Sequence, residues 1–123
     1  MTDDARSCTR RQRLFFERAA RAAQRSSMTH KHGCVIVMPD GNTVCGHNHH
    51  DIHLTDSFSV HAEIDALYKA SKSRKLRGCH MYVVRIGVDA STLKLSRPCS
   101  ACRQKIESVG IRKVYYSTDD FLW

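Results

Sequence analysis

Short apolar segments rich in β-branched residues, separated by stretches of helical periodicity, constrain the fold of this chain most strongly. The segments that fit a strand best are CVIVM at residues 34–38, HMYVVRI at 80–86 and IRKVYYS at 111–117. Strands joined through helices form right-handed crossovers, so the later strands should run parallel. We therefore expect an α/β fold with helices covering a mixed sheet of four to five strands.

Helices and a hairpin account for the remaining elements. Apolar residues at helical spacing predict helices at about residues 9–25, 61–73 and 99–109. Pro39, Asp40 and Gly41 form a turn after the first strand, and residues 43–46 return as its antiparallel partner. The predicted element order is αββαβαβ.

Length and composition favour a single domain over residues 1–123, with residues 1–8 as a flexible N-terminus. The chain has 123 residues, of which 41% are hydrophobic. No run approaches the roughly 18 apolar residues that a membrane span needs, and the charged start is not a secretory signal. We expect an intracellular, most simply cytoplasmic, protein without membrane contact.

The charge is strongly positive, with 20 Lys and Arg against 12 Asp and Glu. Arginines crowd residues 6–25, and a second basic cluster occupies residues 69–77. These clusters fit a polyanion such as RNA or single-stranded DNA, and they equally fit solvated helix faces that keep a small protein soluble. Both interpretations stay open.

Residues 47–59 lack both periodicities and predict a loop, which holds a group of histidines: His47, His49, His50 and His53. They can line a substrate entrance or bind a second metal ion. Their spacing matches no established zinc pattern, so solvated loop residues are the favoured interpretation.

Of the six cysteines, only Cys99 and Cys102 are close in sequence. In a reducing compartment such a pair indicates a metal site or catalysis more often than a disulfide. Cys34 and Cys45, flanked by small or apolar residues, are predicted to be buried in the core.

Potential metal ligands stand at the starts of the last two predicted helices. His61 and Glu63 occur in VHAEI, and Cys99 and Cys102 occur in RPCSAC. Cysteines three apart lie on one face of the first turn, where unpaired backbone N–H groups favour thiolates. Helix starts in parallel crossovers gather at one edge of the sheet, so the two groups can face each other.

One His and two Cys are fewer than the four ligands of a structural zinc site, and a catalytic zinc keeps the fourth position for water. Such an ion lowers the pKa of water from 15.7 to roughly 7. Glu63 can carry the proton only if His61 sits at the helix cap, because residues two apart on a helix point to nearly opposite sides. A redox pair or half of a zinc ribbon would explain PCSAC alone, but not HAE as well.

HAE at residues 61–63 and PCSAC at 98–102 are similar to the signature of the zinc-dependent cytidine/deoxycytidylate deaminase superfamily. HGCVIV at 32–37, GHN at 46–48 and IRKVYYS resemble further segments of that family. The resemblance covers about residues 33–117 and implies a three-layer αβα sandwich.

Carried over residue by residue, the resemblance implies that His61, Cys99 and Cys102 bind Zn²⁺ and that Glu63 shuttles protons. It also implies that the Ala62 backbone helps to hold the base and that Asn48 hydrogen-bonds a sugar hydroxyl. For Asn48, a turn residue without a ligand is the alternative.

The implied activity is hydrolytic deamination of a cytosine nucleoside or nucleotide with release of ammonia. Deoxycytidylate-like substrates are favoured because HAEIDAL resembles that branch. Two alternatives remain: a deaminase acting on cytosine or adenine within RNA or single-stranded DNA, and a nucleic-acid-binding module whose zinc only stabilises the fold.

Two departures from the family pattern affect these expectations. The connection before PCSAC is long, with Leu93, Lys94 and Leu95 inserted, which leaves the rim of the pocket undefined. Residues 119–123 are too short to predict a fifth strand. An uncovered sheet edge, or the apolar tail at residues 121–123, would favour contact with another subunit, so we expect a homo-oligomer.

Overall fold

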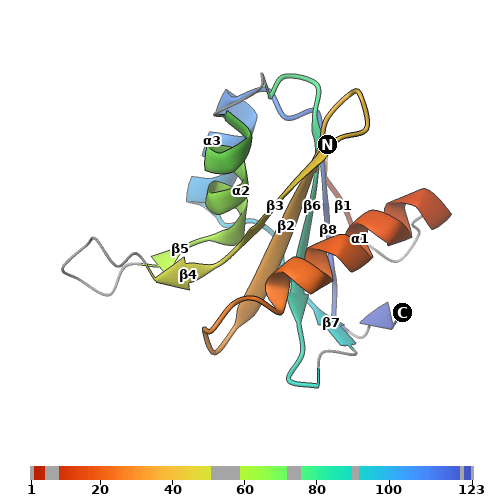
Figure 1. Cartoon of the computed structure of the whole chain (residues 1–123), viewed down its shortest axis with the longest axis vertical. Helices are drawn as coiled ribbons and strands as arrows, with labels where there is room; N and C mark the ends of the chain where they lie inside the picture. Colours follow the sequence, from red (N-terminus) through yellow and green to blue (C-terminus); the bar gives the residue numbers. More distant parts are fainter. Residues whose placement is uncertain are drawn as a thin grey trace.

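The computed structural model describes residues 2–4, 9–50, 59–71, 76–89, 92–119 and 121–122. Its main sheet has the strand order β1-β8-β6-β2-β3 (Figure 1). In that order the strands are Thr2–Asp4, Lys113–Tyr116, His80–Ile86, Lys31–Val37 and Thr43–His47. The three predicted apolar segments are the three central strands.

The strand directions confirm the predicted mixed sheet. β2 pairs antiparallel with β3, as expected for a hairpin, and also antiparallel with β6. β8 is parallel to both β6 and β1. The crossover through a helix thus makes the later strands parallel.

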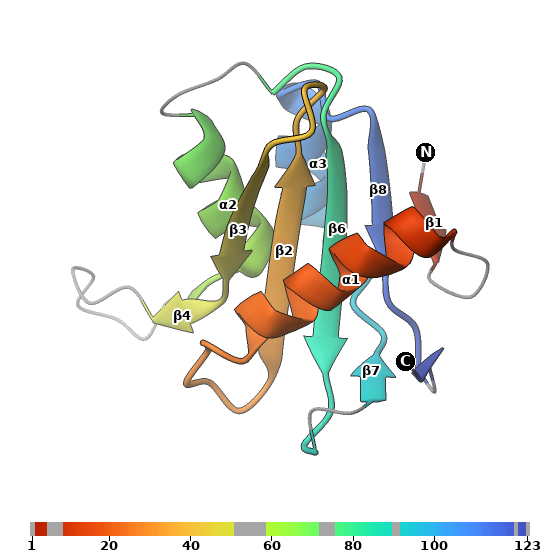
Figure 2. The ribbon, with the colours of Figure 1, turned by 45° about the vertical axis from the view of Figure 1, so that its right-hand side comes forward.

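Helices cover both faces of the sheet (Figure 2). α1 (Arg10–Ala23) packs on one face in a cluster with Tyr82 and Val84, whereas α2 (Ala62–Ser71) and α3 (Ser100–Ser108) pack on the other, around Met81 and Val83. Alternate residues of β6 therefore belong to opposite cores. The predicted three-layer αβα sandwich and the core order αββαβαβ are confirmed.

The chain ends and one connection contain pairings that the sequence did not predict. Residues 2–4, expected to be flexible, form β1 beside β8 and supply the fifth strand. β7 (Thr92–Lys94) lies in the connection predicted to be irregular, and it pairs with β6 and with β9 (Phe121–Leu122). These strands have only two or three residues each, so their sequences carry no periodicity from which to predict them.

Residues 47–59, predicted as a loop, include the two-residue strand β4 (His49–His50) and the first residue of β5 (Ser59–Val60), and the two strands pair antiparallel. Between them, residues 51–58 lie outside the described part of the chain, and with them the histidine at position 53.

The helix starts follow from local chemistry. Thr9 caps α1 through a capping box, in which its side chain accepts from the Gln12 N–H and the Gln12 side chain accepts from the Thr9 N–H. α2 begins immediately after His61, and Cys99 is the N-cap of α3. Of the helices in the described residues, none has the length and apolar character to span a bilayer.

Candidate metal centre and active site

His61, Cys99 and Cys102 meet where α2 and α3 begin. Their ligand atoms all lie within 4.8 Å of one another. The Nδ1 atom of His61 is 3.2 Å from Cys102 Sγ and 3.8 Å from Cys99 Sγ. His61 and Cys99 are exposed and line a cavity, whereas Cys102 is buried.

These separations fit zinc. Bond lengths of roughly 2.0–2.1 Å to nitrogen and 2.3 Å to sulfur place tetrahedral nitrogen and sulfur ligands about 3.6 Å apart. The two observed separations, 3.2 and 3.8 Å, lie on either side of that value. Within the described residues the group has three members, which leaves one tetrahedral position for a water molecule or substrate.

The Cys102 thiol also favours a bound cation at this site. Burial, and next the charge of Glu63, raises the pKa of the Cys102 thiol well above its ordinary value. A thiolate at this position therefore needs a positive charge beside it, which a bound divalent ion supplies.

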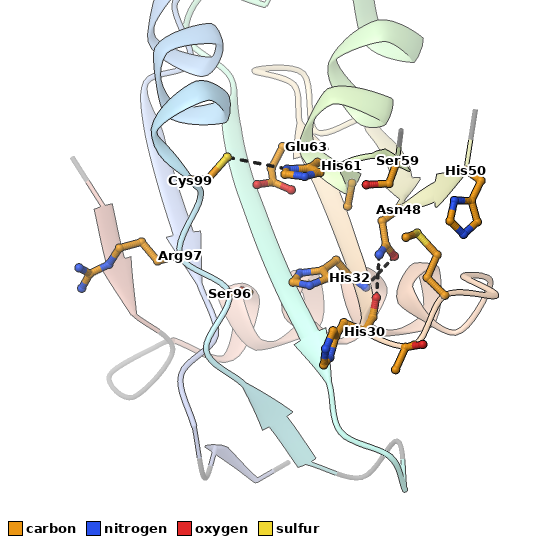
Figure 3. Close-up of a pocket in the computed structure, with 13 residues that line it drawn as sticks. His30, His32, Asn48, His50, Ser59, His61, Glu63, Ser96, Arg97 and Cys99 are labelled. Atoms are coloured by element: carbon orange, nitrogen blue, oxygen red, sulfur yellow. Dashed lines mark hydrogen bonds between the residues drawn. The ribbon is translucent and has the colours of Figure 1, made fainter. Parts of the chain in front are cut away.

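A cavity of about 430 Å³ adjoins the three ligands (Figure 3). Residues from four parts of the chain line it: Met28, Thr29, His30, His32, Asn48, His50, Ser59, His61, Ala62, Glu63, Ser96, Arg97 and Cys99. All six residues singled out from the sequence therefore lie at one site, five of them in the cavity wall and Cys102 beside it.

Among the described residues of this cavity wall, Glu63 is the acidic one. It is buried in the first turn of α2, and burial raises the pKa of its carboxyl group above the ordinary value. Because His61 precedes the helix, its ring need not follow the helical spacing that separates residues two apart. Both side chains consequently reach the same cavity (Figure 3).

Asn48 follows β3 and is buried in the same wall. Its Oδ1 atom accepts from the His32 backbone N–H at 2.9 Å, and its Nδ2 atom donates to the His30 carbonyl at 2.7 Å. These bonds use one N–H and one lone pair of the amide, so one donor and one acceptor position remain for a ligand. Ala62, the first residue of α2, is fully buried and also lines the cavity.

The histidines that the sequence groups together separate in the structure. His50 lines the cavity, whereas the His49 ring lies 3.3 Å from the carboxylate of Asp65. Asp65 also accepts from the His47 backbone N–H and forms an ion pair with Lys69 at 2.9 Å. In the part of the chain that the structure describes, these histidines form no second metal-binding group.

Sequence reasoning missed His32. Burial, followed by the charge of Arg85, lowers its pKa to about 4, so the ring is neutral at pH 7. His32 stands opposite Arg85 in the pairing of β2 with β6, a long-range relationship with no local signal.

Two other expectations have different outcomes. Cys34 is fully buried as predicted, but Cys45 is exposed, which corrects the expectation of a core residue. It lies in β3, at the edge of the sheet, and the residues flanking it in sequence do not reveal an edge position. Of the residues that the structure describes in the two predicted basic clusters, 9–25, 69–71 and 76–77, none lines the cavity.

Several solved structures share this fold. The apo dCMP deaminase from the cyanophage S-TIM5 has a TM-score of 0.73 at 24% identity, covering 93% of this chain and 88% of that one. A cytidine deaminase from Burkholderia pseudomallei has a TM-score of 0.63 at 24% identity, with 80% and 75% covered. One from Mycobacterium leprae has a TM-score of 0.67 at 18% identity, with 87% of each chain covered.

No curated protein matches the chain. The family described as the cytidine and deoxycytidylate deaminase zinc-binding region matches residues 9–118, which include every residue of the site described above. This chain therefore belongs to the cytidine and deoxycytidylate deaminase family.

Proposed function

We propose that this protein hydrolyses the exocyclic amino group of cytosine in a nucleoside or nucleotide, with the corresponding uracil compound and ammonia as products. The observation that carries the proposal is the convergence of His61, Cys99 and Cys102 beside a cavity that also holds the buried Glu63. Three ligands with an open fourth position are typical of catalytic zinc. Membership of the deaminase family supports the same reaction.

His61 through Nδ1, and Cys99 and Cys102 through their sulfur atoms, would hold the ion. Zinc, when bound, lowers the pKa of water enough to provide a nucleophile at neutral pH. Cys102 would hold the ion from the buried side, and His61 and Cys99 would hold it from the side that lines the cavity.

Glu63 would carry the protons. Its carboxylate takes a proton from the attacking water and delivers it to the ring nitrogen beside the reacting carbon. The water oxygen forms a bond to C4, and the bond from C4 to the amino nitrogen then breaks. A second proton passes through Glu63 to the leaving nitrogen, which departs as ammonia. Because burial raises the pKa of the Glu63 carboxyl group, this group is suited both to accept a proton from water and to donate one to the substrate.

Asn48 and Ala62 would position the substrate. The unused donor and acceptor of the Asn48 amide are available to a sugar hydroxyl, and its bonds to His30 and His32 fix its orientation. The backbone of Ala62, next to His61 and Glu63, would contact the base.

The test is ammonia release from cytosine, cytidine, deoxycytidine, CMP, dCMP and a short oligonucleotide by the wild type and by Glu63→Gln. We expect turnover by the wild type and a loss of at least about a thousandfold in the variant, with zinc content and melting temperature unchanged. Glu107→Gln, on the exposed surface of α3, is the matched control.

Substantial turnover by Glu63→Gln would show that another group moves the protons. If the zinc-loaded wild type binds nucleic acid but turns over no cytosine compound, the protein would instead be a nucleic-acid-binding module whose zinc only stabilises the fold.

The expected homo-oligomer and cytoplasmic location stay predictions. Sedimentation of the zinc-loaded protein tests the oligomeric state.

A further inference from the structure

A second cavity, of about 380 Å³, adjoins the proposed deaminase cavity and is strongly basic. Its wall is formed by Gln24, Thr29, His30, Lys31, Arg85, Ile86, Gly87, Val88 and Lys94. Three of these residues carry full positive charges, and none of the described residues of the wall is a carboxylate. Thr29 and His30 belong to both cavities, so the two are neighbours along this segment.

The sheet register places two of the cations in one row with a residue of the deaminase cavity. His32 of β2 pairs with Arg85 of β6, and Arg85 pairs with Lys94 of β7. Residues directly opposite one another in a sheet project from the same face. Arg85 is two residues after Val83, which packs in the core cluster that includes Cys102. The row therefore lies on the face that carries the metal centre.

Placing Arg85 directly opposite Lys94 is unfavourable for folding, because like charges at opposite positions of neighbouring strands repel. The ion pairs of Asp65 with His49 and Lys69 lie outside this row. An anionic ligand between the two side chains would remove the repulsion. A cavity at the same position provides the space for one.

A short series of contacts links Arg85 to the site proposed for the sugar. The Nη2 atom of Arg85 donates to His30 Nδ1 at 2.8 Å, and the carbonyl oxygen of His30 accepts from Asn48 Nδ2 at 2.7 Å. A guanidinium group has five N–H donors, so most remain available after this bond. Hydrogen bonds therefore connect Asn48, which lines the cavity beside the metal ligands, to His30 and His30 to Arg85.

The other arginine near the cavity is engaged elsewhere. Arg97 donates from Nη2 to the Tyr116 hydroxyl at 3.0 Å, and its guanidinium lies over the Tyr116 ring. Its side chain points away from the other labelled residues of the cavity (Figure 3). Arg85 and Lys94 are consequently better placed than Arg97 to meet a group that extends from a nucleoside in the cavity.

We propose that Arg85 and Lys94 form a subsite for a phosphate group attached to the nucleoside whose base lies in the metal-containing cavity. The inference rests on the proposed function and narrows its substrate class to cytosine nucleotides over nucleosides. Arg85 donates hydrogen bonds to phosphate oxygens, and Lys94 supplies a second positive charge from β7.

The test compares kcat/KM for dCMP and deoxycytidine in the wild type, Arg85→Gln, Lys94→Gln and the control Lys105→Gln, an exposed cation of α3. We expect a preference for dCMP in the wild type and a loss of about tenfold for dCMP in each cavity variant. Turnover of deoxycytidine and all values for Lys105→Gln should be unchanged. Constant deoxycytidine turnover also shows that the variants are folded.

A binding measurement gives a second, independent readout. Calorimetric titration with dUMP and deoxyuridine should show that dUMP binds more tightly to the wild type and that Arg85→Gln removes most of the difference. Arg85→Lys keeps the charge but not the planar donors, and we expect it to restore binding only in part.

A short oligonucleotide containing one cytosine separates the two sources of phosphate. If Arg85→Gln and Lys94→Gln weaken only the oligonucleotide, with a steep dependence on salt, the phosphate belongs to a polymer backbone and the subsite stands. Equal losses for dCMP and deoxycytidine, or no loss for any phosphorylated substrate, would overturn the subsite while leaving the deaminase proposal intact. Absence of turnover with every cytosine compound would instead contradict the proposed function.

Discussion

The Oδ2 atom of Asp65 in α2 accepts a hydrogen bond from the backbone N–H of His47, the last residue of β3, at 3.0 Å. This bond ties the helix that begins after His61 to the chain just before Asn48. Lys69 holds the same carboxylate from the next turn of α2. Asp65 is therefore a positioning residue between the two halves of the proposed substrate site.

Asp65→Ala should leave the His47 N–H without its partner and destabilise the protein by about 1–3 kcal/mol. It should also raise KM more than it lowers kcat, because Asn48 loses its fixed position while Glu63 stays in α2. Urea denaturation and steady-state kinetics measure the two effects. A change in kcat alone would place Asp65 in the chemical step, contrary to this account.

Acid should remove the stabilising effect of Asp65. Burial by itself raises the pKa of this carboxyl group, but hydrogen bonds from Lys69 and the His47 N–H, with the charge of Lys69, lower it below the ordinary value of 3.8. A lowered pKa gives stability that is present above the unfolded pKa and is lost as the pH falls through the folded pKa. The stability difference between wild type and Asp65→Asn should thus shrink below about pH 4. A difference that stays constant down to pH 2 would contradict this assignment.

Gly33→Ala should destabilise the protein severely. A Cβ atom at Gly33 would lie 2.6 Å from the backbone nitrogen of Ala23 and still closer to the carbonyl oxygen of Ala19, and neither backbone atom can rotate away. Overpacking of this kind costs about 3 kcal/mol or more. Gly41→Ala, in an open turn with a φ of 90°, is the control and should cost only about 1 kcal/mol. Similar urea midpoints for the two variants would show that α1 can move away from β2.

Cys102→Ser should reduce zinc from about one ion per chain to a small fraction, and should lower the melting temperature. Cys45→Ser changes an exposed cysteine outside the site and should retain both properties. Elemental analysis and thermal denaturation provide the measurements. A chelator should lower the melting temperature of the wild type and of Cys45→Ser, but hardly that of Cys102→Ser. Full zinc occupancy in Cys102→Ser would exclude Cys102 as a ligand.

Ser117→Ala should loosen the connection that carries Lys94 and leads to Cys99. The buried Ser117 hydroxyl donates to the Lys94 carbonyl at 2.6 Å and accepts from the Arg85 N–H at 3.2 Å. Leaving these groups unpaired should cost about 1–3 kcal/mol. Ser108→Ala, at the exposed end of α3, should change stability by less than about 0.5 kcal/mol. Hydrogen exchange of the Arg85 amide should rise only in Ser117→Ala, and an unchanged rate would argue against this role.

Much of the fold was predictable because its signals are local. β6 was predicted at its observed bounds, since its short run of consecutive apolar residues indicates a strand directly. Helices were also predicted to start at about His61 and Cys99, one residue before the observed starts of α2 and α3, from residues within one turn of each start. The short strands β1, β7 and β9 were missed because two or three residues carry no pattern.

The sequence by itself determined the chemical types at the site: an imidazole and two thiols as ligands, and a carboxylate beside them. These residue types could be recognised from short motifs and from their positions at helix starts, and both features depend only on neighbouring residues along the chain. Only the tertiary structure decided that the His61 ring stands 3.2 Å from Cys102 Sγ, and that Arg85 and Lys94 form one row with His32. These relationships depend on strand register and crossover length, which join residues dozens of positions apart and are set by the packing of the whole sheet.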